Sequence, residues 1–127
     1  VPVTDMLPAA AQGIIGVVSR DDADVELRAA LAKLNVVISE AAATAERTFL
    51  AVLDGSCRTP IAAHLFDDGN TWRLDGEVLS PKGDQRWTAT GSASKSASMA
   101  QLAELGRTVA NGILESAEGK LPAFGAE

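Results

Sequence analysis

Two stretches of the chain alternate between apolar and polar residues, and this alternation constrains the fold more than any other feature. In residues 71–79 every second side chain from Trp72 to Val78 is apolar or a glycine, and those between are charged. Residues 85–91 repeat the pattern around Trp87. A strand with this period buries one face only, as is typical of antiparallel sheets. The sequence therefore predicts antiparallel strands with one face turned to solvent.

A third strand and two turns complete this part of the chain. The apolar residues 61–66 precede Asp-Asp-Gly-Asn at 67–70, which separates them from the strand at 71–79. Residues 80–84, Ser-Pro-Lys-Gly-Asp, then lead into the strand at 85–91. Aspartate, asparagine, proline and glycine are the residues that turns favour. We therefore expect a three-stranded antiparallel sheet.

Amphipathic helices are predicted on either side of these strands. The first begins at Ser39, an N-cap candidate, and runs to about Leu53, where Asp54-Gly55 breaks it. The second begins near Met99, after a serine-rich link. The residues that recur at helical spacing are Ala42, Ala45, Glu46, Phe49, Leu50 and Leu53 in the first helix, and Met99, Leu102, Gly106, Val109 and Ile113 in the second. The predicted fold class is α+β, a three-stranded antiparallel sheet covered on one face by helices.

The N-terminal part of the chain has a different pattern. Residues 13–19 form a continuous, largely β-branched apolar run, which is typical of a strand covered on both faces in a parallel or mixed sheet. Asp21 to Asp24 offer N-caps for a helix that follows, with apolar residues recurring up to Asn35. A single strand cannot cover both of its own faces. We therefore expect residues 1–35 to be a strand–helix unit that lacks its neighbours.

Composition excludes several classes of protein. The net charge is −6, from 11 Lys and Arg against 17 Asp and Glu, which disfavours a nucleic-acid partner. The apolar runs are far shorter than the roughly 20 residues of a spanning helix, so no membrane partner is expected. One cysteine and one histidine make neither an internal disulfide nor a protein-only zinc site, so we expect no metal and a reducing compartment.

Cys57 is the first candidate for chemistry, because it lies in a glycine-containing loop between a predicted helix and a predicted strand. A lone cysteine is more often a small buried apolar residue than a nucleophile. Its neighbours act in opposite directions, since Arg58 favours the thiolate whereas Asp54 disfavours it. His64, on the predicted strand, is a poor candidate for its base.

Two further positions are of interest. Glu46 lies on the apolar helix face, as either a buried ion-pair member or, more commonly for such residues, the edge of the stripe. Gln12 and Gly13, just before the apolar run, occupy a place where a ligand could approach the backbone. From the residues alone, the chain is an α+β domain with one interesting cysteine.

Two longer segments resemble a known family. Residues 7–17, Leu-Pro-Ala-Ala-Ala-Gln-Gly-Ile-Ile-Gly-Val, resemble the hinge and following strand of porphobilinogen deaminases, also called hydroxymethylbilane synthases. Residues 45–62, which include Glu-Arg-Thr-Phe-Leu and Asp-Gly-Ser-Cys-Arg-Thr-Pro, resemble the cofactor-attachment region of that family. The resemblance covers the chain in order but corresponds only to the C-terminal part of a family member. It implies that residues 1–35 are the hinge and last strand–helix unit of an upstream α/β domain, and that residues 36–127 are the cofactor-attachment domain.

The resemblance also implies an activity. Members of the family are transferases that join porphobilinogen units, with loss of ammonia, into hydroxymethylbilane for haem and chlorophyll synthesis. Cys57 matches the thiol that carries the dipyrromethane cofactor through a thioether, while Gln12 and Gly13 match hinge residues near the cofactor and substrate rings. The family's acid/base aspartate and its basic residues for the pyrrole carboxylates lie upstream of Val1. We therefore expect no catalytic residue in this fragment and no activity from it alone.

The expected partners follow from the same resemblance. They are porphobilinogen and the upstream domains of a monomeric enzyme, located in the cytoplasm, or in the plastid of a plant or alga. The alternative is a free-standing, non-catalytic α+β binding domain derived from the same fold. A thiol redox protein ranks lower, since the chain has no second cysteine to resolve a disulfide.

Overall fold

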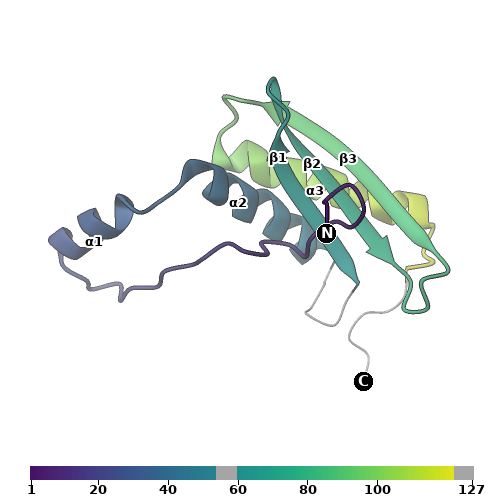
Figure 1. The fold of residues 1–127 in the computed structure, drawn as a ribbon, viewed down its shortest axis with the longest axis horizontal. Helices are drawn as coiled ribbons and strands as arrows, with labels where there is room; N and C mark the ends of the chain where they lie inside the picture. The colour runs from purple at the N-terminus through teal and green to yellow at the C-terminus, as the bar shows by residue number, and fades with distance from the viewer. Residues whose placement is uncertain (54–59, 122–127) are drawn as a thin grey trace.

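The computed structural model describes residues 1–53 and 60–121, whereas residues 54–59 and 122–127 lie outside the described residues. Within the described residues, three helices and three strands follow one another (Figure 1). In chain order they are α1 (Val25–Ala32), α2 (Val37–Val52), β1 (Ile61–Asp67), β2 (Thr71–Leu79), β3 (Arg86–Ser94) and α3 (Met99–Ala117).

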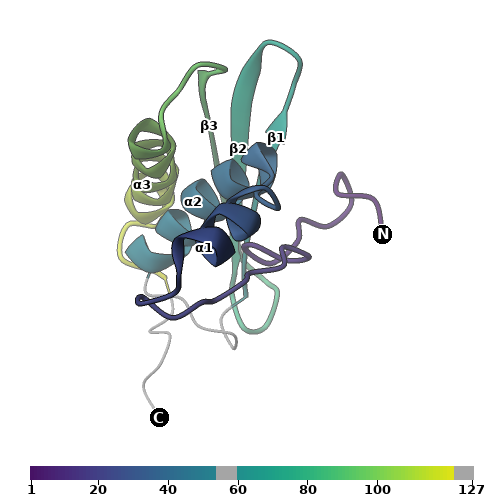
Figure 2. The ribbon, with the colours of Figure 1, turned by 90° about the vertical axis from the view of Figure 1, so that its left-hand side faces the viewer.

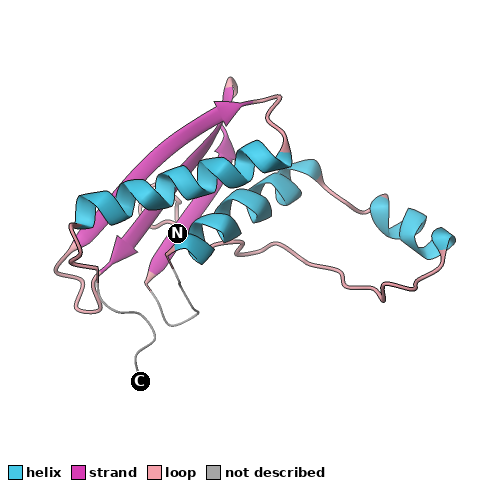
Figure 3. Ribbon diagram, turned by 180° about the vertical axis from the view of Figure 1, so that it is seen from behind, coloured by secondary structure: helices cyan, strands magenta, loops and turns pink. Residues whose placement is uncertain are grey.

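The strands form one antiparallel sheet in the order β1-β2-β3. The register aligns Leu65 of β1 with Leu74 of β2, and Leu74 with Gly91 of β3. Helices α2 and α3 lie side by side across one face of this sheet, as Figures 2 and 3 show. The predicted α+β class, with a three-stranded antiparallel sheet covered on one face by helices, is confirmed.

The core lies between the helices and the inner face of the sheet. In β2 the apolar residues predicted to face inward, from Trp72 to Val78, are buried, and Arg73 between them is exposed. Trp87 of β3 is only partly buried, at the margin of the core. The largest fully buried side chains are Phe49, Leu74, Leu102, Ile113, Val78 and Val109. Burial of a side chain of this kind contributes about 1.5 to 3 kcal/mol to folding, so this layer accounts for much of the stability.

Two of the three described helices begin where the sequence predicted, and one begins earlier. Asp24 caps α1 by accepting a hydrogen bond from the Leu27 amide, and Ser98 caps α3 in a reciprocal capping box with Gln101. The prediction that Ser39 caps the next helix is wrong. Helix α2 begins earlier, because the Val36 carbonyl already accepts a 3.0 Å bond from the Glu40 amide.

Strand β3 also differs from its predicted extent, continuing to Ser94 where the sequence predicted an end at Gly91. The added residues pair with the start of β2, where Thr71 lies opposite Ser94. The serines read as a link in the sequence are therefore partly a strand, because cross-strand pairing outweighs their weak intrinsic preference.

The predicted strand at residues 13–19 does not form. This segment is extended but is not paired with any described strand, and Ile15, Val17 and Val18 are 89%, 64% and 95% exposed. A strand requires a neighbour to take its backbone hydrogen bonds. Helix α1 forms but ends at Ala32, with Lys33 as its C-cap, short of the predicted end at Asn35. It buries no residue and lies at the far end of this extended connection (Figure 1). Among residues 1–53 and 60–121, no helix is both long enough and apolar enough to cross a bilayer.

Candidate functional site

The predicted hinge runs along the outer edge of strand β1. The Ala63 amide donates a 3.1 Å hydrogen bond to the carbonyl oxygen of Pro8. Ala10, two residues later, packs against the core. Since β1 is the end strand of the sheet, this contact takes a donor that pairing with β2 leaves free. The structure thus joins the hinge to the sheet, which the sequence pattern did not predict.

Gln12 and Gly13 form a tight turn in this segment, and both are exposed. The Gln12 side-chain oxygen accepts a 3.0 Å bond from the Ala9 amide, and the Gln12 amide donates at 3.0 Å to the Ala9 carbonyl. Gly13 has φ +82°, a conformation that glycine adopts readily. Both residues of the turn are therefore accessible to solvent.

Glu46 of α2 is the buried polar group next to the hinge, only 4% exposed. Its Oε2 accepts a 2.7 Å bond from the Ala11 amide, and its Oε1 accepts a 2.7 Å bond from the Leu65 amide of β1. His64 Nδ1 lies 3.9 Å from Oε1. Of the two interpretations left open by the sequence, the edge of the apolar stripe is wrong, because the carboxylate is enclosed and bonded on both oxygens.

Burial raises the pKa of the Glu46 carboxyl above its ordinary value. The two backbone N–H groups and the nearby His64 lower it, but less than the loss of water raises it. His64 itself is half-buried and stacks on Phe66, with ring centres 5.6 Å apart. Glu46 is thus held as a hydrogen-bond acceptor in a place from which water is excluded.

Cys57 lies within residues 54–59, outside the described residues. The chain on either side is well anchored. Leu53, at the end of α2, is buried in the core, and the Pro60 carbonyl accepts a 2.9 Å bond from the Leu79 amide. The same two elements, α2 and β1, hold Glu46 and its Leu65 partner.

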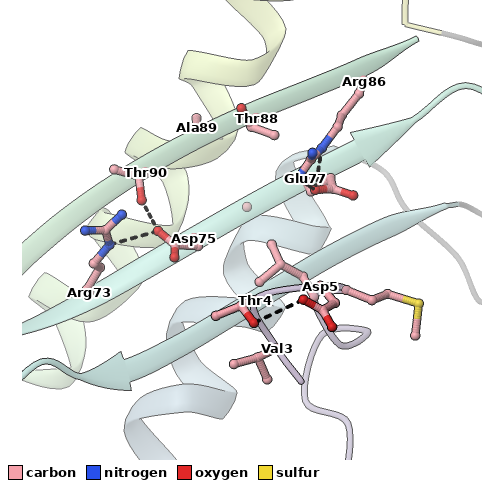
Figure 4. Close-up of a pocket in the computed structure, with 13 residues that line it drawn as sticks. Val3, Thr4, Asp5, Arg73, Asp75, Glu77, Arg86, Thr88, Ala89 and Thr90 are labelled. Atoms are coloured by element: carbon pink, nitrogen blue, oxygen red, sulfur yellow. Dashed lines mark hydrogen bonds and ion pairs between the residues drawn. The ribbon is translucent and has the colours of Figure 1, made fainter. Parts of the chain in front are cut away.

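The uncovered face of the sheet carries a hollow of about 510 Å³ between the N-terminal segment and strands β2 and β3. Figure 4 shows the side chains of Arg73 and Arg86 at this hollow. Arg73 pairs with Asp75 at 3.0 Å, and Arg86 pairs with Glu77 at 2.6 Å. Both arginines are therefore already matched by carboxylates of the same sheet. The sequence did not predict this hollow, because residues 3–7 have no periodic pattern.

No group of three potential metal ligands occurs among residues 1–53 and 60–121. The expectation of no metal site remains a prediction for the chain as a whole.

Comparison with known proteins identifies the family. The C-terminal domain of porphobilinogen deaminase, as a family model, matches residues 40–115, from α2 to α3. The chain belongs to the porphobilinogen deaminase family. The resemblance drawn from residues 7–17 and 45–62, and its restriction to the C-terminal portion, are confirmed.

Individual porphobilinogen deaminases agree with this assignment. The chain is 49% identical over 81 residues to the one from Paracoccus denitrificans, covering 64% of this chain and 26% of that protein. It is 38% identical over 113 residues to the one from Nitrobacter hamburgensis, covering 89% and 34%. It is also 38% identical over 111 residues to the one from Staphylococcus aureus, covering 87% and 34%. The chain thus spans about a quarter to a third of the length of these relatives.

Proposed function

We propose that this chain acts as the C-terminal part of a hydroxymethylbilane synthase, with Cys57 as the attachment point of a dipyrromethane cofactor. The observation that carries the proposal is the family match over residues 40–115. The chain's single cysteine falls inside that match, in the segment that resembles the family's attachment region. The substrate would be porphobilinogen, and the product the linear tetrapyrrole.

The chemistry of the available groups fits such a cofactor. A thioether needs one thiol, and Cys57 is the only thiol in the chain. The pyrrole rings carry carboxylates, which need cations to balance them. Arg73 and Arg86 are each already paired with a carboxylate of the sheet. In this proposal the other cations for the rings come from upstream domains, as does the acid/base group.

In this proposal each part of the chain has a limited task. Cys57 forms one carbon–sulfur bond to an aminomethyl carbon of porphobilinogen as its carbon–nitrogen bond breaks, and the thiol proton leaves with the released ammonia. The thioether then keeps the cofactor through successive turnovers. When bound, the dipyrromethane supplies the nucleophilic pyrrole carbon from which the product grows. Gln12 and Gly13 present open backbone toward the rings. Residues 1–35 belong with an upstream α/β domain, and residues 36–127 form the attachment domain.

A chimera tests the proposal directly. The upstream part of the Paracoccus denitrificans deaminase is joined to this chain in place of its own C-terminal portion, and the purified protein is weighed intact. We expect a mass increment of one dipyrromethane on Cys57 and conversion of porphobilinogen. Cys57→Ala should lose both, whereas Ser56→Ala, the neighbouring control, should keep both.

Two results would overturn the assignment. One is an active chimera with an unmodified Cys57, and the other is full activity in the Cys57→Ala variant. A well-folded chimera with neither adduct nor activity would favour the free-standing, non-catalytic domain.

The fragment alone is expected to be inactive, because deamination needs groups that this proposal assigns to the upstream part. Ammonia release from porphobilinogen by the isolated 127 residues would contradict that division of tasks.

A further inference from the structure

A single buried carboxylate joins three parts of this fold that lie far apart in the sequence. Glu46 stands on α2, accepts a hydrogen bond from Leu65 on β1, and accepts another from Ala11 in the hinge. Along the chain, Leu65 is 19 residues from Glu46 and Ala11 is 35 residues from it. Hydrogen bonds to an ionised acceptor are stronger than neutral ones, and burial protects them from competing water.

The contact also closes the exposed edge of the sheet. Strand β1 has no neighbour on its outer side among the described strands. In the hinge, the Pro8 carbonyl accepts a hydrogen bond from the Ala63 amide, and Glu46 accepts one from the Leu65 amide. The two outward-facing amides of this part of β1 are thus both hydrogen-bonded, Ala63 to the Pro8 carbonyl and Leu65 to the Glu46 carboxylate.

The hinge residue that Glu46 holds has an unusual backbone. Ala11 has φ +60°, a left-handed conformation that alanine rarely adopts. Such a conformation persists where surrounding contacts hold it in place. The bond from the Ala11 amide to Glu46 is a contact of this kind, and Gln12 and Gly13 follow immediately.

We propose that Glu46 is a positioning residue, whose carboxylate fixes the turn at residues 11–13 against the edge of β1. Its meaning for catalysis rests on the proposed function, because Gln12 and Gly13 are the hinge residues expected near the cofactor and substrate. Glu46 fixes where these two residues lie relative to α2 and β1. It acts through the hinge and touches no reacting group.

The ionised carboxylate accepts both bonds and carries no donor of its own, whereas protonation places an O–H on one of the two oxygens and weakens that oxygen as an acceptor. Among the described residues, the titratable side chain that faces Glu46 is His64 of β1. Hinge residues 7–13 carry no ionisable side chain, and the buried residues of α3 are all apolar or glycine. The Ala11 and Leu65 amides should therefore report one shared ionisation.

Nuclear magnetic resonance on this chain tests the contact without any assay of activity. The Ala11 and Leu65 amide proton shifts are followed against pH, and their hydrogen exchange is compared in wild type and Glu46→Gln. We expect one common midpoint for both amides, and exchange at Ala11 faster by roughly tenfold or more in the variant. Glu40→Gln is the matched control, because Glu40 is an exposed carboxylate on the same helix, and its side chain accepts a bond from the Asn35 side chain rather than from the hinge or β1.

Different midpoints for the two amides, or unchanged Ala11 exchange in Glu46→Gln, would overturn the proposal. If Glu46→Gln loses protection from hydrogen exchange throughout the core, the pH titration of the two amides in the wild-type chain decides whether the proposal holds.

The chimera described above supplies the catalytic readout. There, Glu46→Gln should keep the mass increment on Cys57 while lowering kcat/KM by roughly tenfold or more, because the hinge is misplaced. Full activity in that variant would refute the positioning role. An unmodified, inactive wild-type chimera would instead refute the proposed function and leave the contact seen by magnetic resonance intact.

Discussion

Gly106 of α3 lies directly against the carbonyl oxygen of Ala45 in α2, with no room for a methyl group between them. A Cβ at Gly106 would also come within 3.1 Å of the Phe49 amide nitrogen. The two helices therefore meet almost backbone to backbone. This close approach lets both of them reach the same face of a sheet only three strands wide.

Replacing Gly106 by alanine should separate the two helices. We expect a loss of about 1 to 3 kcal/mol in the free energy of unfolding, measured by urea denaturation, because the clash is with backbone that cannot move aside. Gly112→Ala is the control in the same helix, where the new Cβ would meet the Ala89 Cβ at an ordinary 3.5 Å. That variant should gain about 0.5 to 1 kcal/mol from helix propensity. Equal effects from the two substitutions would contradict this account of the helix contact.

Gly76 of β2 provides a second packing test. A Cβ there would lie 2.7 Å from the Cζ atom of Phe49, so Gly76→Ala should destabilise the protein by about 1 to 3 kcal/mol. Combining it with Phe49→Leu should cost less than the sum of the two single changes, because the shorter side chain makes room. Additive losses in thermal unfolding would show that the two residues do not compete for space.

The uncovered residues 14–18 should exchange their amide hydrogens quickly in the isolated chain. None of the described strands pairs with them, and three of their apolar side chains are largely exposed. Hydrogen exchange read by mass spectrometry should therefore show weak protection here and strong protection within residues 39–116. Adding the upstream part should protect residues 14–18. Strong protection in a proven monomer of this chain would contradict the prediction.

The stability of the chain should depend on pH through Glu46. Its pKa is raised in the folded protein, so above its ordinary value of 4.5 the folded state holds a proton that the unfolded state has released. The free energy of unfolding should therefore fall as pH rises from 4.5 through the raised pKa, and then level off. Urea denaturation of wild type and Glu46→Gln at a series of pH values measures this, with the variant lacking that fall. If the free energy of unfolding changes with pH in the same way in both proteins, the assignment of this pH dependence to Glu46 is wrong.

Two aspartates should change the free energy of unfolding in the opposite direction, at lower pH. Bonds from Lys95 and from the Gly69 amide lower the pKa of Asp67, and bonds from the Thr71 and Asn70 amides lower that of Asp68. Their contribution is present above the ordinary value of 3.8 and is lost as pH falls below it. Comparison with Glu46→Gln separates these aspartates from Glu46, because they are present in both proteins.

The sheet and its two covering helices could be predicted because their side-chain periods are local properties of the chain. The alternation from Trp72 to Val78 places apolar groups on one face whatever the neighbours are. The segment at residues 13–19 shows the converse. Its apolar character predicts a strand, but pairing depends on a partner, and no described strand supplies one.

The candidate site, too, could be predicted from the sequence only in part. Cys57, Gln12 and Gly13 were identified through motifs, and their roles remain predictions. The environment of Glu46 was not predictable, since a glutamate on an apolar helix face can lie at the rim or be enclosed. Only the approach of the hinge and of β1, from distant parts of the chain, enclosed it.

By itself, then, the sequence determined what repeats or is contiguous: the periods of helices and strands, the N-cap of α1, and the segments that mark the family. The tertiary structure decided what depends on distant contacts. These are the start of α2 at Val37, the extension of β3 to Ser94, and the joining of hinge and sheet edge through Glu46. The physical reason is that a side-chain period follows from local backbone geometry, whereas a hydrogen bond or a close helix contact exists only where the folded chain brings its two partners together.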